Sequence, residues 1–211
     1  MIFTEEQLNK LRLRVSEEMS PKRFVHTAEV EKMAIRLGEL YVPEKIDVLR
    51  AAALLHDTTK EYTIEKQLQI CREFGIIITK QDILTPKTLH ARTAAALIPS
   101  VYPEFADSEV ISAVRWHTTG RDSMSVCEKL IYLADYIDMS RKFEDCVRLR
   151  NAFWDAEPQN MSESQRDIHL TKILVTSFDM TLKALVEEHA PISDDTFKAR
   201  NTLLISLRRE E

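Results

Sequence analysis

Apolar residues recur with helical spacing along most of the chain. Near the start, Thr4 and Gln7 stand three residues apart, so each side chain can satisfy a free backbone amide of the other in a capping box. Leu8, Leu11 and Val15 then follow at intervals of three and four residues. Similar polar starts and apolar stripes predict further helices, and with them an all-α fold. These lie over about 20–41, 43–57, 63–74, 90–97, 109–116, 125–137, 162–189 and 194–209.

Three stretches interrupt this pattern. Residues 76–79 are rich in β-branched side chains, but no partner strand exists elsewhere, so we expect an extended segment that packs on the core. Pro99 and Pro103 are expected to bracket a loop, and the polar residues 151–160 a junction. In the helix over 20–41, an inner face is expected to include Val25.

The segment 48–55 is apolar on nearly every side, which predicts a central, buried helix. His56 and Asp57 directly follow this segment. Burying an imidazole and a carboxylate there is costly unless a partner neutralises and orients them, and a divalent metal would do both. The alternative is an ordinary hydrogen-bonded pair in the core.

Composition narrows the classes of function. Only three glycines are present, which argues against a glycine-rich phosphate loop, and the net charge of −5 gives no basic surface for duplex nucleic acid. No segment has the pattern of a membrane span or a signal peptide. Cys71, Cys127 and Cys146 are widely spaced, which is typical of idle thiols in a reducing compartment. We therefore expect a cytoplasmic protein without a membrane partner.

Four other ionisable residues are candidates for the same site. Asp135 is embedded in an apolar helical segment, where carboxylates are rare unless they pair with an arginine or bind a metal. His26, His90 and His117 lie near predicted helix ends. Taken singly, His26 is compatible with a helix surface, and His90 and His117 with capping of a helix terminus.

The order of these residues resembles the HD superfamily of metal-dependent phosphohydrolases, and within it the YqeK-like family of symmetrical bis(5′-nucleosyl)-tetraphosphatases. Five segments between about residues 10 and 150 carry the resemblance, and the most specific part is His117-Thr118-Thr119-Gly120-Arg121, at the end of the fourth. They are Arg23-Phe24-x-His26-Thr27, Leu54-Leu55-His56-Asp57-x-x-Lys60-Glu61, His90-Ala91, Ala113-Val114-Arg115-Trp116-His117-Thr118-Thr119-Gly120-Arg121 and Glu128-Lys129-x-x-Tyr132-x-Ala134-Asp135-Tyr136-Ile137. The sequence departs from the family at Met139 and Ser140, where a proline and a small residue are expected before Arg141.

The resemblance implies an HD-domain helical bundle over residues 1–150, with a core over 20–140, and a C-terminal helical extension, residues 151–211, packed on it. It implies hydrolysis of diadenosine tetraphosphate to two molecules of ADP by a metal-activated water, with iron as the metal. One ion would be firmly held and a second is possible. The implied metal ligands are His26, His56, Asp57 and Asp135, and the implied substrate-binding residues are Lys60, His90, His117, Thr118, Thr119, Arg121 and Arg141.

Physical arguments add possible catalytic roles for four of these residues. The second oxygen of Asp57 is suited to orient or deprotonate water. Lys60 is four residues from His56, so we expect it on the same side of a continuing helix, facing a phosphate; the alternative is a surface ion pair with a glutamate. His90 and His117 could donate to phosphate oxygens or instead hold a second ion.

Two other functions remain open at this stage. One is an HD-class phosphohydrolase for another nucleotide, such as a deoxynucleotide or a nucleotide messenger, and the other is a non-catalytic nucleotide-binding module. A homodimer is a further possibility, because the C-terminal helices are amphipathic.

Overall fold

The computed structural model describes residues 2–209, and within that range it contains helices, turns and loops but no strand. The all-α prediction is therefore confirmed. Residues 76–79 form no regular structure, as expected, but none of them is buried and Ile77 is 80% exposed, so the expected packing of this segment on the core was wrong. Four short 3-10 turns, each beginning at a proline, precede α3, α6, α7 and α10. The α-helices are α1 (Glu5–Glu18), α2 (Pro21–Tyr41), α3 (Ile46–Leu55), α4 (Ile64–Glu73), α5 (Lys80–Leu84), α6 (Leu89–Val101), α7 (Ser108–Trp116), α8 (Val126–Ile137), α9 (Glu144–Trp154), α10 (Glu163–Glu187) and α11 (Asp194–Arg209).

Most helix starts follow the capping residues that the sequence indicates. The Gln7 amide donates to the Thr4 hydroxyl at 3.2 Å, and the Thr4 amide donates back to the Gln7 side chain at 2.8 Å. Ser125 and Glu128 form the same reciprocal pair at the start of α8. These local bonds satisfy amides that a helix terminus leaves free, so they set where each helix begins.

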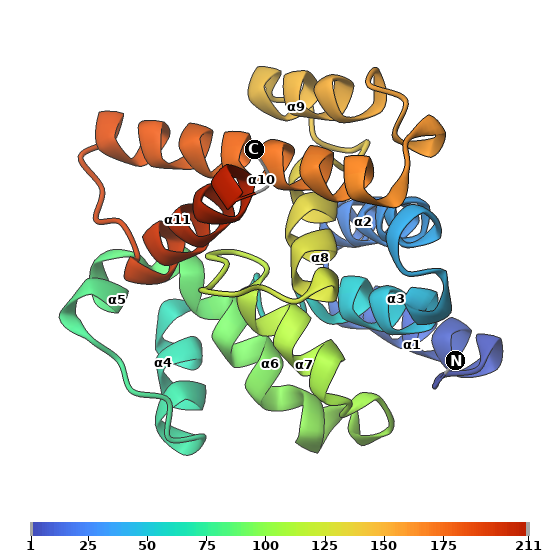
Figure 1. Ribbon diagram of the computed structural model, residues 1–211. Helices are drawn as coiled ribbons and strands as arrows, with labels where there is room; N and C mark the ends of the chain where they lie inside the picture. The colour runs from blue at the N-terminus through green and yellow to red at the C-terminus, as the bar shows by residue number, and fades with distance from the viewer. Residues whose placement is uncertain (1, 210–211) are drawn as a thin grey trace.

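The central helix is α3, as predicted. All of its residues except Ile46 are buried, and it packs against α1, α2, α7 and α8. In Figure 1, α8 runs through the middle of the molecule, with α2 and α3 on one side of it and α7 on the other. His26 and Asp135 lie on α2 and α8, and His56 and His117 directly follow α3 and α7.

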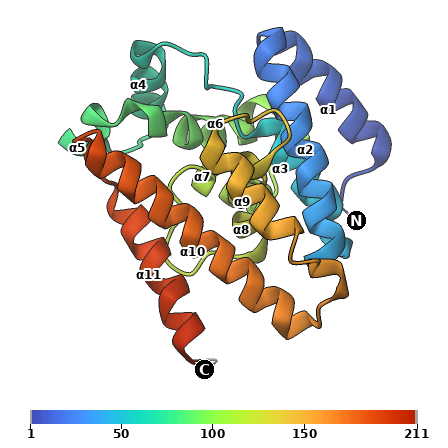
Figure 2. The ribbon, with the colours of Figure 1, turned by 90° about the horizontal axis from the view of Figure 1, so that it is seen from above.

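The last two helices lie along one side of this bundle. Figure 2 shows α10 crossing the molecule with α11 beside it, and α10 also packs against α9 and α8. Phe178 of α10 stacks on Tyr132 of α8 with ring centroids 4.5 Å apart. Gly120, at φ +63°, leaves no room for a side chain, because an added Cβ would lie 2.7 Å from Phe178 and 2.9 Å from Ala199.

Several local expectations were wrong. Helix α6 continues through Pro99 to Val101, since the fixed φ of proline is helical and only one backbone bond is lost in a final turn. Helix α9 covers part of the expected junction over 151–160; its buried Cys146, Leu149 and Phe153 have helical spacing. Helix α5 was not predicted, and Val25 is 58% exposed rather than on the inner face.

Two expectations concern the chain as a whole. Helix α9 runs across residue 150, so the division into residues 1–150 and 151–211 stays an interpretation. Among the residues that the structure describes, no helix has both the length and the apolar character needed to cross a bilayer.

Candidate metal centre

The candidate cluster consists of His26, His56, Asp57, His90, His117 and Asp135. Two of its histidines occupy the position that directly follows a helix. His56 is the C-cap of α3, and His117 is the C-cap of α7. The last carbonyls of a helix lack an amide partner within it. His56 donates from Nδ1 to the Ala53 carbonyl at 2.6 Å, and His117 donates from Nδ1 to the Val114 carbonyl at 2.7 Å.

His90 is held in the same way at the start of α6, where its Nδ1 donates to the Lys87 carbonyl at 2.8 Å. A carbonyl only accepts, so the proton of each neutral ring is fixed on Nδ1. The Nε2 lone pairs of all three rings are then free to face the interior. Second-sphere bonds of this kind commonly orient histidine ligands of metals.

Asp57 stands between the two halves of the cluster. Its Oδ2 lies 3.5 Å from His56 Nε2 and 3.7 Å from His26 Nε2. Its Oδ1 lies 3.2 Å from His90 Nε2 and 3.8 Å from His117 Nε2. One buried carboxylate therefore faces all four imidazoles.

Asp135 of α8 approaches the cluster from the other side. Its Oδ1 lies 3.0 Å from His26 Nε2 and 3.9 Å from His56 Nε2. The opposite nitrogen of His26, Nδ1, lies 3.4 Å from Asp138 and 3.2 Å from the Ser140 hydroxyl. The six candidate residues thus converge from α2, α6, α8 and the ends of α3 and α7.

The donor set fits a divalent metal ion. His56 Nε2 and His26 Nε2 are buried without a hydrogen-bond partner, and the Nε2 atoms of His90 and His117 are only 3.0 Å apart. Two neutral imidazoles that both carry their proton on Nδ1 repel each other at that distance unless a cation lies between them. Four overlapping groups of potential ligands result: His26, His56, Asp57; His56, His117, Asp135; Asp57, His90, His117; and His26, Asp135, Asp138.

Cationic side chains surround the two central carboxylates. Arg23 Nη1 lies 2.7 Å from Asp57, Arg141 pairs with Asp135, and Lys60 Nζ lies 3.2 Å from His90 Nε2. The reason given for placing Lys60 here was wrong, because α3 ends at Leu55 and Lys60 lies in the following turn, with its amide bonded to the Asp57 carbonyl. The turn nevertheless brings its amine to the cluster.

The loop after His117 sends only part of its side chains inward. Thr118 Oγ1 lies 3.3 Å from His90 Nε2. Thr119 is buried and donates to the Gly120 carbonyl, whereas Arg121 donates from Nε to Glu128 at 2.9 Å. Of these, Thr118 is the residue in contact with the cluster, and a phosphate role for Thr119 and Arg121 stays a prediction.

Burial and neighbouring charges shift the pKa values of the cluster in opposite directions. Burial lowers the pKa of His56, and burial together with His56 and His90 holds the pKa of His117 well below its usual value. Burial opposes the charge of Asp57, but His56, His90 and Lys60 outweigh it and hold its pKa well below the usual range. These shifts favour neutral His56 and His117 beside an ionised Asp57, the protonation states that metal ligation requires of these three residues.

Sequence reasoning missed three residues that support the site. Arg23 was quoted only as part of a motif, and no role was given to Asp138 or Ser140. Asp138 follows three residues after Asp135 in an apolar segment, a local signal that a second buried carboxylate was present.

Comparisons with known proteins agree with this geometry. A family model described as HD domain matches residues 23–140. A symmetrical bis(5′-nucleosyl)-tetraphosphatase of Halalkalibacterium halodurans is 31% identical over 193 residues, which cover 90% of this chain and 94% of that protein. A protein of the same name from Staphylococcus aureus is 35% identical over 136 residues, covering 64% of this chain and 68% of that protein.

A solved structure supports the same relationship. The crystal structure of a protein from Clostridium acetobutylicum, described as a predicted HD superfamily hydrolase involved in NAD metabolism, superposes with a TM-score of 0.81 at 31% sequence identity. The match covers 94% of this chain and 97% of that one.

Proposed function

The chain belongs to the HD-domain family, whose members are metal-dependent hydrolases, and we propose that it cleaves diadenosine tetraphosphate symmetrically to two molecules of ADP. The observation that carries this proposal is the position of Asp57. It faces His26 and His56 with one oxygen and His90 and His117 with the other. The names of the relatives supply the substrate class.

We assign His26, His56, Asp57 and Asp135 as ligands of one ion. Asp57, His90 and His117 form a group that suits a second ion. Imidazole and carboxylate ligands suit a divalent transition metal, and iron is the metal that the family resemblance implies.

When bound, the metal would neutralise phosphoryl oxygens and make water a better nucleophile. Asp57 is placed to hold a proton of that water, since it is ionised and central. The water oxygen attacks one of the two central phosphorus atoms, and the bond from that atom to the middle bridging oxygen breaks. The bridging oxygen leaves on the second ADP.

Three cations would stabilise the charge that develops on the phosphates. Lys60 lies beside His90 and is suited to a non-bridging oxygen of the leaving half. Arg23 and Arg141 offer planar donor forks and are held in place by Asp57 and Asp135. Thr118 adds a hydroxyl next to His90.

Product analysis of wild type and variants tests this function. Wild type should give ADP as the sole nucleotide product, whereas His56→Ala and Asp57→Ala should lose metal and activity. His189→Asn is a matched control, because His189 is exposed at φ +53°, where asparagine is tolerated. Formation of AMP and ATP, or faster release of orthophosphate from a mononucleotide, would contradict the proposal, as would full activity of the two alanine variants.

A further inference from the structure

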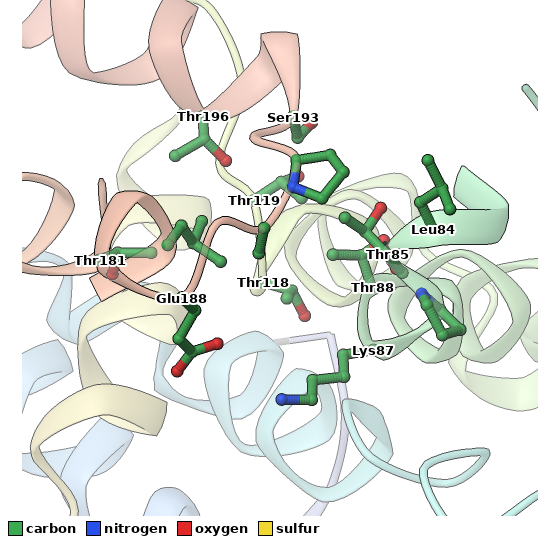
Figure 3. Close-up of a pocket in the computed structure, with 14 residues that line it drawn as sticks. Leu84, Thr85, Lys87, Thr88, Thr118, Thr119, Thr181, Glu188, Ser193 and Thr196 are labelled. Atoms are coloured by element: carbon green, nitrogen blue, oxygen red, sulfur yellow. Dashed lines mark hydrogen bonds between the residues drawn. The ribbon is translucent and has the colours of Figure 1, made fainter. Parts of the chain in front are cut away.

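A cavity of about 310 Å³ lies beside the metal centre. One wall comes from the segment between α5 and α6, and the opposite wall from the end of α10 and the connection to α11. Figure 3 shows Thr118 between these walls, with Ser193 and Thr196 on one side of it. Lys87 and Glu188 extend on the other side.

This cavity begins one hydrogen bond away from the cluster. Thr118, which lines it, lies 3.3 Å from His90 Nε2, and Lys87, which also lines it, accepts the Nδ1 proton of His90 at 2.8 Å through its carbonyl. Thr118 and Lys87 therefore connect the cavity to His90, which itself lines a neighbouring pocket together with Pro86 and Lys87.

The walls combine apolar surface with a few polar groups. Leu84 and Pro86 face the cavity from one side, and Leu185 and Pro191 from the other. Such surfaces suit a flat aromatic ring, and a few well-placed polar groups commonly fix the orientation of a ligand. The carboxylate of Glu188 is of the type that accepts hydrogen bonds from the hydroxyls of a ribose.

We propose that this cavity binds one nucleoside of the substrate, with the base between the two apolar walls, the ribose at Glu188 and the first phosphates directed along Thr118 to His90. This inference rests on the proposed function. The volume is at the lower end for small-molecule sites, about 300 Å³ and above, so it accommodates one nucleoside rather than the whole dinucleotide. The C-terminal helices thereby become part of the substrate site.

A cavity-filling variant tests the proposal directly. Ala190 lines the cavity from the connection after α10, so Ala190→Trp should exclude the base and weaken binding of ADP by at least about tenfold. Binding of inorganic pyrophosphate, which lacks the nucleoside, should stay within about twofold of wild type. The measurement is calorimetric titration of the metal-loaded protein.

Ala184→Trp is the matched control, since Ala184 is exposed on the same helix end and does not line the cavity. It should bind both probes as wild type does. Equal ADP affinity in wild type and Ala190→Trp, or an equal loss for ADP and pyrophosphate, would overturn the proposal.

Glu188, which is exposed, provides a second test that does not depend on the folding of the Ala190→Trp variant. Wild type should prefer ADP over 2′,3′-dideoxy-ADP by about tenfold, as expected for hydrogen bonds to a charged group, and Glu188→Gln should reduce this preference to about twofold or less. An unchanged preference in Glu188→Gln would contradict the ribose contact and with it the proposed orientation.

These outcomes separate the inference from the function on which it rests. If wild type fails to cleave diadenosine tetraphosphate but Ala190→Trp loses ADP and keeps pyrophosphate, the nucleoside site stands and the reaction is wrong. If wild type cleaves diadenosine tetraphosphate to ADP but Ala190→Trp and Glu188→Gln bind ADP as wild type does, the reaction stands and the cavity is not the nucleoside site.

Discussion

His26 differs from the other cluster histidines because both of its nitrogens face carboxylates. Nε2 lies 3.0 Å from Asp135 and Nδ1 lies 3.4 Å from Asp138. Burial opposes the charged ring, but these two carboxylates outweigh it and raise the pKa of His26 to about 9. In the metal-free protein, an imidazolium at position 26 thus supplies positive charge where the cation would bind.

Metal uptake should therefore release a proton from His26. Because the protonated ring cannot ligate, metal affinity is expected to fall by about tenfold for each pH unit below 9 through this residue alone. Titrations at several pH values against a competing chelator measure this slope. His26→Gln should bind metal more weakly and with a slope lower by about one proton; an unchanged slope would show that His26 is not the group that titrates.

At the scale of elements, α9 supports the site without contributing a candidate ligand. Arg150 is 8% exposed and donates to the carbonyls of Ile137 at 2.7 Å and of Arg141 at 2.8 Å, as well as to that of Asp138. These bonds hold the turn after α8 that carries Asp138, Ser140 and Arg141.

Replacing Arg150 by methionine should loosen that turn. Three carbonyls would lose their donor, with an expected cost of about 1–3 kcal/mol in the free energy of unfolding. The variant should also hold metal more weakly, because the partners of His26 and Asp135 lie in the turn. Denaturant unfolding and metal content measure the two effects.

Arg148→Met is the control for this substitution. Arg148 is exposed on the same helix and pairs with Asp145 alone in the described contacts. Equal stability and equal metal content in the two variants would contradict a supporting role for Arg150.

At the scale of the whole molecule, the C-terminal helix α10 packs against segments that carry residues of the metal centre. Phe178 of α10 is fully buried, stacks on Tyr132 one turn before Asp135, and lies against Gly120 in the loop that follows His117. The same side chain therefore touches two of the segments that carry cluster residues.

Phe178→Ala should leave a cavity at this junction. The expected cost is about 3–5 kcal/mol in the free energy of unfolding, as for other buried phenylalanines, together with lower metal occupancy. Phe197→Ala, in the exposed part of α11, should change both quantities little. Thermal and denaturant unfolding followed by metal analysis compares the variants, and similar behaviour of the two would refute the coupling.

How far the sequence predicts this molecule follows from the range of each interaction. Helix starts at Thr4, Ser20 and Ser162 depend on bonds over three residues and were correct. The contact of His26 with Asp138 joins residues 112 positions apart, and no local pattern indicates it. The pairing of Arg121 with Glu128, seven residues later, was not expected from the motif, and the role of Arg121 at phosphate stays a prediction.

The hydrogen bonds from three cluster histidines to main-chain carbonyls affect which mutations can disturb the site. The acceptors for His56, His90 and His117 are main-chain carbonyls of residues 53, 87 and 114, which every amino acid possesses. No single substitution at residues 53, 87 or 114 removes the carbonyl acceptor. The orientation of the three imidazole rings therefore tolerates mutation at these positions. His26 depends instead on the side chains of Asp138 and Ser140, so a substitution at either position can turn its ring.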